Sequence, residues 1–452
     1  MRSTLVVGSI VAVFAAAAFG GSMRRRAIPH VAAALFEARG AAEASARGAG
    51  VEPPVDPTRI AEWIDALGKG GAEAIEAARA LAKPGAGSER AIDALTTALG
   101  SKDAMLRGAA ANALGAIGPA AHRAVPALID HFEDTESAGA DDVWILASRA
   151  VGRMGSAAVD PLVAKLDASR PRVFTAACGA LHDIGPDAAK GLTRLREEIT
   201  KDGDLTIPAM FAVAGMGKAG GEALDDIARM LDSRNFHHQY WACRAIGELG
   251  EVGAPAVPKL IDRLNDGVVS VRRHAAAALG GIGPAAGPDA VAALIAALDD
   301  KLEPVREDAV IALGKMGEAA ASAVPKIQEH LAGTRMTARA RLAGALWRIA
   351  PSERGAAEKV LFEELESLNA PWSAAEELAF IAPQCGRIGE VAARLRSENA
   401  ETRQFAAMAL GGMGSAASEH VALLRQIAND SAADEDTRKA AAEAADRIGA
   451  AK

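Results

Sequence analysis

The 452-residue sequence has few of the residues on which covalent chemistry or nucleic-acid binding usually depends. Its three cysteines, Cys178, Cys243 and Cys385, lie far apart and form no CxxC pair. An odd, dispersed set of cysteines is neither a disulfide framework nor a zinc site, so we expect three small, partly buried side chains. The formal net charge of -8 excludes the basic field that supplies most non-specific affinity for nucleic acid.

Enzyme signatures are also missing. The sequence contains no P-loop, no GxGxxG after a strand, no HExxH and no Gly-x-Ser-x-Gly, so the phosphate, dinucleotide, zinc and serine-nucleophile motifs are excluded. We therefore predict no catalytic residue, no cofactor and no metal ligand.

Aromatic residues make up only 4% of the chain, whereas half of its residues are apolar. Small aliphatic residues in that excess suit closely spaced helices. A cassette recurs through the chain, for example Ala-Leu-Gly-Ala-Ile-Gly-Pro at 113–119 and Ala-Leu-Gly-Gly-Ile-Gly-Pro at 278–284, and its closing position returns every 30 to 37 residues between Gly118 and Gly449. Such a period predicts a stacked array of one helical unit.

One copy, residues 271–300, shows how the unit is built. Apolar residues from Val271 to Ile282 follow a helical period, Gly283 suits a left-handed cap, and Pro284 opposes continuation of the helix. A second helix follows with Val291 to Leu298 on one face. Gly280 lies inside the first helix, where glycine is unfavourable, so we expect close approach between helices there.

The repeated pattern of Asp, then Val-Arg, then the Ala-Leu-Gly cassette occurs as Asp266 with Val271-Arg272 and as Asp300 with Val305-Arg306. Over residues 72–449 this pattern resembles the HEAT repeat, most closely the short HEAT-like repeats named after phycobilisome lyases. The resemblance implies an all-α fold, a right-handed α-solenoid of about eleven helix-hairpin repeats. It also implies first helices on the convex side, second helices on the concave side, and a structural ladder of Asp with Arg107, Arg272, Arg306, Arg339, Arg403 and Arg438.

Some proteins of this architecture are enzymes. The iron-dependent hydroxylases among them use His-Glu dipeptides, and no histidine here is followed by Glu. A lyase or another enzyme that acts on a small molecule remains an alternative by repeat resemblance, although fold does not carry function.

The N-terminus predicts attachment to a membrane. Leu5 to Phe19 is apolar and lies between Arg2 and the arginines at 24–26. We expect residues 1–26 to be an uncleaved anchor, with a cleaved export signal or a core helix as alternatives. The downstream arginines favour the cytoplasmic side for the repeats, but the sequence leaves the side of the membrane open. Residues 27–57 read as an Ala-rich helix with a Pro-rich linker, and residues 58–452 as the repeat solenoid.

A cluster of aromatic and basic residues at 234–241 includes the one tyrosine of the chain. A shift by one repeat aligns Trp241 with polar residues of other copies, so we expect Tyr240 and Trp241 to be exposed and to bind a protein partner. The alternative is that this repeat repacks and covers them. A metal at His237 and His238 is disfavoured because adjacent helical residues point about 100 degrees apart. The candidate partner-binding residues are Arg234, Phe236, His237, Tyr240 and Trp241.

Glutamate is concentrated between Ser352 and Glu377. We interpret this run as a solvated helix face, with a surface for a basic partner as the alternative. Together these features predict a non-catalytic, membrane-attached scaffold or adaptor that binds a protein. A small-molecule enzyme and a self-associating architectural protein are the rival functions.

Overall fold

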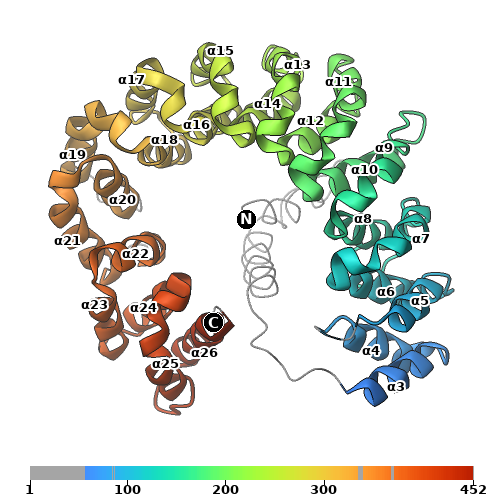
Figure 1. Cartoon of the computed structure of the whole chain (residues 1–452). Coiled ribbons are helices and arrows are strands. Elements are labelled where there is room, and N and C mark those ends of the chain that lie inside the picture. The colour runs from blue at the N-terminus through green and yellow to red at the C-terminus, as the bar shows by residue number, and fades with distance from the viewer. Residues whose placement is uncertain (1–55, 84, 86, 334–338, 368–370, 451–452) are drawn as a thin grey trace, which may run out of the picture. The chain divides into compact units, whose positions relative to one another are not determined.

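A computed structural model of the chain describes residues 56–83, 85, 87–333, 339–367 and 371–450 (Figure 1). Within these residues every element is helical, apart from an isolated antiparallel bridge between Ser137 and Asp142. The chain divides at Lys259, inside helix α15, into two compact units. The predicted membrane segment 1–26 and the segment 27–55 lie outside the described residues.

Unit 1 ends at Lys259, and its described part begins with helix α3 (Pro57–Leu67). Asp56 caps this helix by accepting a hydrogen bond from the Thr58 amide. The first helices of its repeats are α4 (Gly71–Leu81), α6 (Ala104–Ile117), α8 (Val143–Arg153), α10 (Pro171–Ile184), α12 (Thr206–Gly215) and α14 (Phe236–Leu249). The second helices are α5 (Glu89–Ala98), α7 (Val125–Asp130), α9 (Val159–Val163), α11 (Leu192–Thr200), α13 (Leu224–Met230) and α15 (Val257–Arg263).

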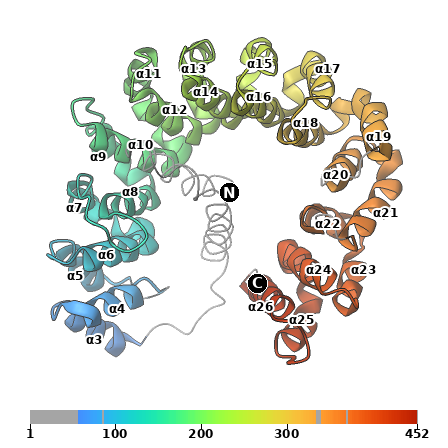
Figure 2. The same cartoon turned by 180° about the vertical axis from the view of Figure 1, so that it is seen from behind.

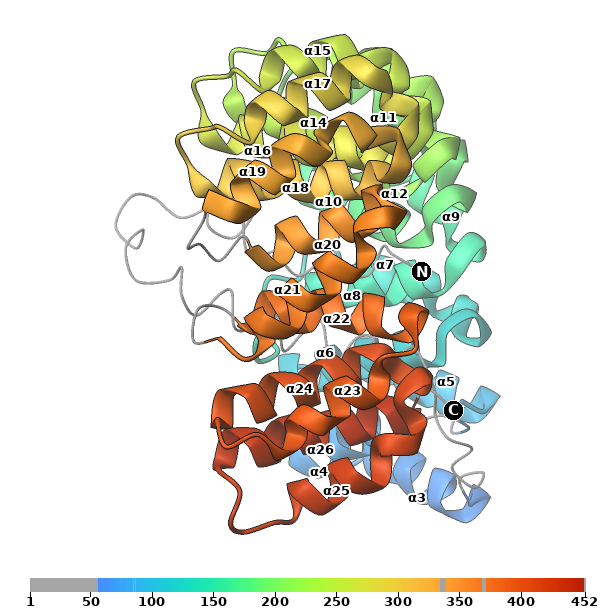
Figure 3. The same ribbon diagram turned by 90° about the vertical axis from the view of Figure 1, so that its left-hand side faces the viewer.

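Unit 2 follows the same plan. Its first helices are α16 (Val269–Ile282), α18 (Glu303–Met316), α20 (Arg339–Ile349), α22 (Pro371–Cys385), α24 (Ala400–Met413) and α26 (Glu435–Ala450). Its second helices are α17 (Gly287–Ala297), α19 (Val324–Gly333), α21 (Arg354–Leu365), α23 (Ile388–Ala393) and α25 (Val421–Ala428). Figure 3 shows α20, α22 and α24 following one another along the stack.

Within each unit, the first helices form the inner, concave row and the second helices form the outer row (Figures 1 and 2). This arrangement is the reverse of the one that the family resemblance implied. The reason lies in residue size, because first helices meet through glycine and alanine, as at Gly115 against Ala150 and Gly411 against Ala444. A stack curves toward the row whose helices approach most closely, so the Ala-rich and Gly-rich row becomes the inside.

Most first helices are followed by a 3-10 turn rather than by an irregular loop. Gly283 ends α16 with φ 70 and ψ -146, a conformation reserved for glycine. Pro284 then does not stop the chain but opens a 3-10 turn, Gly283–Ala286, that leads into α17. The predicted glycine requirement is confirmed, but the backbone is not the left-handed helical cap expected from the sequence.

The glycines inside first helices are confirmed as points of close approach. A Cβ built on Gly280 would lie 2.7 Å from the Cα of Ala312 in α18, which is backbone and cannot rotate away. The unfavourable helix propensity of glycine is thus offset by tight packing between neighbouring first helices.

We predict opposite effects for two Gly-to-Ala changes in unit 2. Gly280→Ala should destabilise the protein by about 1 to 3 kcal/mol, because α16 and α18 must separate. Gly355→Ala, in α21, meets no atom within 4 Å and should be neutral or stabilising by up to about 1 kcal/mol. Urea unfolding followed by circular dichroism measures both changes, and a stabilising Gly280→Ala would contradict the packing argument.

The predicted Arg and Asp ladder is present. Arg272 donates from Nε to Asp300 Oδ2 at 2.8 Å and from Nη1 to the Asp266 carbonyl at 2.9 Å. Arg107 and Arg403 repeat this pattern with Asp134 and Asp434. The remaining three arginines are also engaged, namely Arg306 with the Asp300 carbonyl, Arg339 with Glu364, and Arg438 with the Ala433 carbonyl. Arg107, Arg272 and Arg403 thus each bind the loop before their own helix and the aspartate of the following loop.

Burial opposes ionisation of Asp300, but hydrogen bonds from Arg272 and from the Leu302 amide hold the pKa of its carboxyl below the ordinary value. The carboxylate is therefore charged at neutral pH and depends on the Arg272 guanidinium. The side chains of Arg272 and Asp300 are only 10% and 13% exposed, so loss of either one leaves a buried group without its partner.

We predict that Arg272→Ala destabilises the protein by about 3 kcal/mol or more. The matched control is the neighbouring Arg273→Ala, which removes a pair with Asp308 from a side chain that is 45% exposed and should cost less than about 1 kcal/mol. Chemical unfolding measures the difference, and hydrogen exchange should locate the loss of Arg272 to α16 and α18. Equal losses for both variants would contradict the structural role of the ladder.

One segment of unit 2, Val269–Ala297, is long and apolar enough to cross a membrane by length and composition alone. The segment is half buried and consists of α16, a 3-10 turn and α17 folded as a hairpin. A hairpin packed in the array is a core element, so this segment is not evidence for a membrane span.

Candidate protein-binding surface

The predicted partner-binding residues lie at the start of α14, on the inner row of unit 1. Asn235 caps this helix, since its side-chain oxygen accepts a hydrogen bond from the His237 amide at 3.0 Å. The cap fixes which residues point outward. Phe236, Tyr240 and Arg244 are four residues apart and therefore share one face of α14.

Most of the predicted residues are accessible. Arg234 and His237 are exposed, and the Phe236 side chain is 43% exposed, which is high for a large apolar residue. The Phe236 and His237 rings lie 4.0 Å apart. Tyr240 is half-buried, and this burial raises the pKa of its hydroxyl to about 12, against a smaller lowering effect of Arg244.

The expectation that Trp241 is exposed is wrong. The Trp241 side chain is 3% exposed, lies edge-on to Phe211 of α12 with 6.2 Å between the ring centroids, and carries the Arg244 guanidinium at 4.9 Å. Phe211 in turn stacks on His182 of α10 at 3.8 Å. Between α16 and α18, the ion pair of Arg273 with Asp308 lies at the helix contact. Helix α12 has no charged residue that could form such a pair with α14. At this contact the Trp241 ring packs against α12 instead.

The two adjacent histidines point to different environments. His237 is exposed, whereas His238 is buried and its Nδ1 lies 2.5 Å from Asp202 Oδ1. The Ser233 hydroxyl also donates to Asp202, at 2.9 Å. Within the described parts of the chain, no group of three His, Cys, Asp or Glu residues is placed to hold a metal ion.

The acidic run between Ser352 and Glu377 is only in part a solvated face, because Glu363 and Glu366 are exposed whereas Glu364 and Glu377 are buried. Glu377 is buried and accepts hydrogen bonds from both Arg341 and Arg348 of α20. Other glutamates in the run pair with arginines of neighbouring helices, Glu358 with Arg387, Glu364 with Arg339 and Glu366 with Arg394. Sequence reasoning failed here because the compensating arginines lie about one repeat away.

Sequence reasoning missed a second aromatic cluster, on α22 of unit 2. Trp372 and Phe380 are 36% and 51% exposed, and they lie eight residues apart on one face of the helix. Arg341 lies over the Trp372 ring at 5.4 Å, and Arg348 lies over the Phe380 ring at 4.7 Å. The chain has few aromatic residues, so two of them at a helical spacing could have been recognised from the sequence as a candidate surface cluster.

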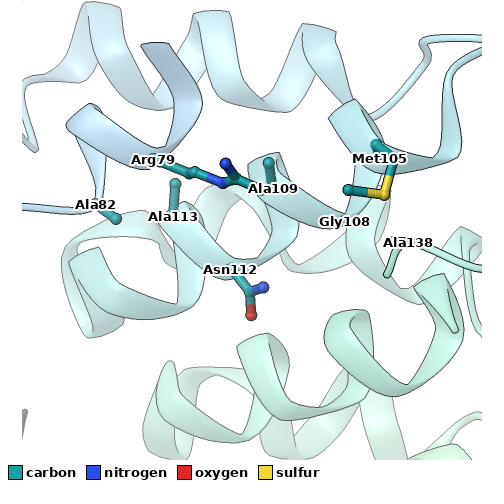
Figure 4. A pocket seen from close by; sticks show the side chains of 8 residues that line it. All are labelled: Arg79, Ala82, Met105, Gly108, Ala109, Asn112, Ala113 and Ala138. Atoms are coloured by element: carbon teal, nitrogen blue, oxygen red, sulfur yellow. The ribbon is translucent and has the colours of Figure 1, made fainter. Parts of the chain in front are cut away.

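A small open pocket of roughly 170 Å³ lies on α6 in unit 1 (Figure 4). Ligand and cofactor sites are commonly about 300 to 1,000 Å³, so this pocket is the size of a side chain rather than a substrate. Its lining comes from α4, from α6 and from the loop before α8, and comprises Arg79, Ala82, Met105, Gly108, Ala109, Asn112, Ala113 and Ala138.

Comparison with known protein families shows to which family the helical repeats belong. The family model described as HEAT repeats matches residues 60–143, 192–280, 257–347 and 390–452, more than half of the chain. This protein belongs to the HEAT-repeat family. The match confirms the predicted family and the all-α solenoid, whereas the finer likeness to the phycobilisome-lyase repeats remains a prediction.

Several solved structures are similar to the chain, all at low sequence identity. Importin beta matches at 14% identity over 95% of this chain and 68% of its own, with a TM-score of 0.49. The Kap95:Nup1 complex matches at 14% identity over 94% and 65%, with a TM-score of 0.48. An engineered protein matches at 21% identity over 86% and 99%, with a TM-score of 0.30. No curated protein matches the sequence.

Within this HEAT solenoid, burial separates the residues of the α14 cluster into two roles. Trp241 joins α12 and α14 as a packing residue, whereas Phe236 and His237 lie at the surface above it. Tyr240 connects the two groups, with its ring 5.2 Å from that of Trp241. We define the α14 patch as Arg234, Phe236, His237 and Tyr240.

Substitution should separate these roles. We predict that Trp241→Ala lowers stability by about 3 to 5 kcal/mol, because a large buried ring is removed. Phe236→Ala should change stability by less than about 1 kcal/mol, because its ring is half in solvent. Thermal and urea unfolding of both variants provide the measurement, and a harmless Trp241→Ala would contradict the packing role assigned to Trp241.

Proposed function

We propose that this protein is a non-catalytic scaffold or adaptor whose concave rows bind a protein partner. The observation that supports this most directly is the position of the exposed large side chains. Phe236 on α14 and the pair Trp372 and Phe380 on α22 lie on first helices, which form the concave rows. Exposed aromatic residues beside arginine are typical of residues that dominate the energy of protein interfaces.

Both clusters are held rigid before any partner arrives. Trp241 supports the α14 patch from below, and Glu377 fixes the two arginines that cover Trp372 and Phe380. Less conformational freedom is then lost on binding, which favours affinity.

Two further elements of the proposal come from the sequence. The apolar segment Leu5 to Phe19 with its flanking arginines is proposed to attach the protein to a membrane and to keep the repeats in the cytoplasm. The net charge makes a protein rather than a nucleic acid the proposed partner.

Two rival functions remain. A small-molecule enzyme would need a pocket with converging titratable groups, and the pocket on α6 is lined by one charged residue, Arg79. A self-associating architectural protein would bury the same aromatic residues against a second copy, which light scattering of the detergent-solubilised full chain would detect.

The function is tested by capture of partners from detergent-solubilised cells, with quantitative mass spectrometry of the bound proteins. The wild-type chain should retain at least one protein that is lost, by about tenfold or more, with Arg234→Ala/Phe236→Ala/His237→Ala. The control is Asp225→Ala, an exposed residue on the second helix α13, which should retain it.

Both variants should match the wild type in helicity and melting temperature, because every changed side chain is exposed. A partner retained equally by all three proteins would exclude the α14 patch. Absence of any specific partner, together with a discrete oligomer of the purified chain, would favour the architectural function instead.

A further inference from the structure

The pocket on α6 exists because of a long loop in unit 1. Successive cassette glycines Gly118 and Gly155 are 37 residues apart rather than the usual 32 to 34, and the extra residues lie in the loop 131–142. Ala138, near the tip of this loop, rests on Gly108 of α6, where any Cβ would collide with Ala138. Gly108 therefore allows the loop to lie on the helix and to form one wall of the pocket.

Ion pairs fix the loop in this position. Arg107 of α6 binds Asp134 at 2.7 Å and Glu136 at 2.8 Å, and Arg149 of α8 binds Asp141 at 2.6 Å. The Ala138 amide also donates to the Asp141 carbonyl at 2.9 Å. The wall is thus held from both neighbouring first helices, so the pocket is preformed and does not depend on a ligand to create it.

The lining of the pocket combines an apolar surface with a nearly equal polar one. Met105, Ala109 and the other alanines supply an apolar surface, and Arg79 of α4 and Asn112 of α6 supply hydrogen-bond donors (Figure 4). Arg79 is the charged residue of this lining. Its pair with Glu76 on the same helix joins two largely exposed side chains, and such pairs contribute at most about 1 kcal/mol. The guanidinium is therefore free to turn toward a new carboxylate.

We propose that this pocket receives one glutamate side chain of the protein partner. The apolar walls fit the methylene stem, the guanidinium of Arg79 fits the carboxylate through charge-assisted hydrogen bonds, and the volume fits one side chain. This proposal rests on the protein-binding function proposed above and adds the chemistry of the segment that is bound, which is an acidic residue flanked by small or apolar ones.

A library of random dodecapeptides displayed on phage tests the proposal on the full-length, detergent-solubilised protein. Selected peptides should share a glutamate, and its replacement by glutamine should weaken binding by about tenfold or more. Arg79→Gln in the protein should cause a similar loss, and the two changes together should cost little more than either alone, because they remove the same contact.

A second variant tests the pocket without changing charge. Ala109→Leu fills the pocket and should abolish binding of the selected peptides, whereas Ala116→Leu, exposed on the same face of α6 two turns away, should leave it intact. Arg153→Gln, an exposed arginine of α8, is the matched control for Arg79→Gln and should bind as the wild type does.

The outcomes separate the pocket from the wider function. A set of selected peptides that all bind Arg79→Gln and Ala109→Leu as well as they bind the wild type would overturn the pocket while the protein-binding function stands. A library that yields no binder at all would overturn the pocket, whereas the protein-binding function is decided by the capture experiment. Helicity of each variant, measured in parallel, excludes unfolding as the cause of any loss.

Discussion

The close approach of neighbouring first helices is the constraint on which the rest of this molecule depends. At Gly280 the backbone of α18 lies where a side chain would stand, and Gly115 and Gly411 repeat the arrangement in the two units. Because these helices are packed so closely, the first row is the shorter side of each unit and becomes concave. The residues that a partner would meet in the concavity are therefore those of the Ala-rich and Gly-rich helices.

The ladder of arginine and aspartate residues stabilises the same stack of helices through contacts in the loops. Arg272 bridges from one repeat to Asp300 of the next and also binds the Asp266 carbonyl, so one side chain fixes both the loop and its neighbour. At α14 the ladder changes, since Gln239 takes the arginine position and binds the Ser233 carbonyl, while His238 pairs with Asp202. Helices α8, α10, α12 and α22 also lack a ladder arginine, so in these repeats, as at α14, other contacts hold the loop and the neighbouring helices.

The aromatic cluster on α22 depends on glycine in another way. A Cβ on Gly344 of α20 would collide with Glu377, so the glycine makes room for this buried carboxylate. Glu377 then holds Arg341 and Arg348, which lie over Trp372 and Phe380. The missing side chain in α20 thus leaves room for the carboxylate that holds the two arginines over the exposed rings of α22. In both clusters, buried residues organise a surface that looks from the sequence like a simple group of polar and aromatic residues.

The sequence by itself determined the helical hairpin, its period and the need for glycine at positions such as Gly280 and Gly283, because these follow from local steric rules and from a repeated pattern. It also identified Arg272 and its counterparts as structural. Only the tertiary structure decided which row is concave, that Trp241 is buried, and that several glutamates of the acidic run, among them Glu377, are paired with arginines. Each of these depends on contacts between helices about 30 residues apart in the chain, such as Phe211 with Trp241 and Arg348 with Glu377. Residue type does not reveal such partners. A tryptophan at this position would be exposed beside a charged helix, but Trp241 is buried because the neighbouring α12 is uncharged.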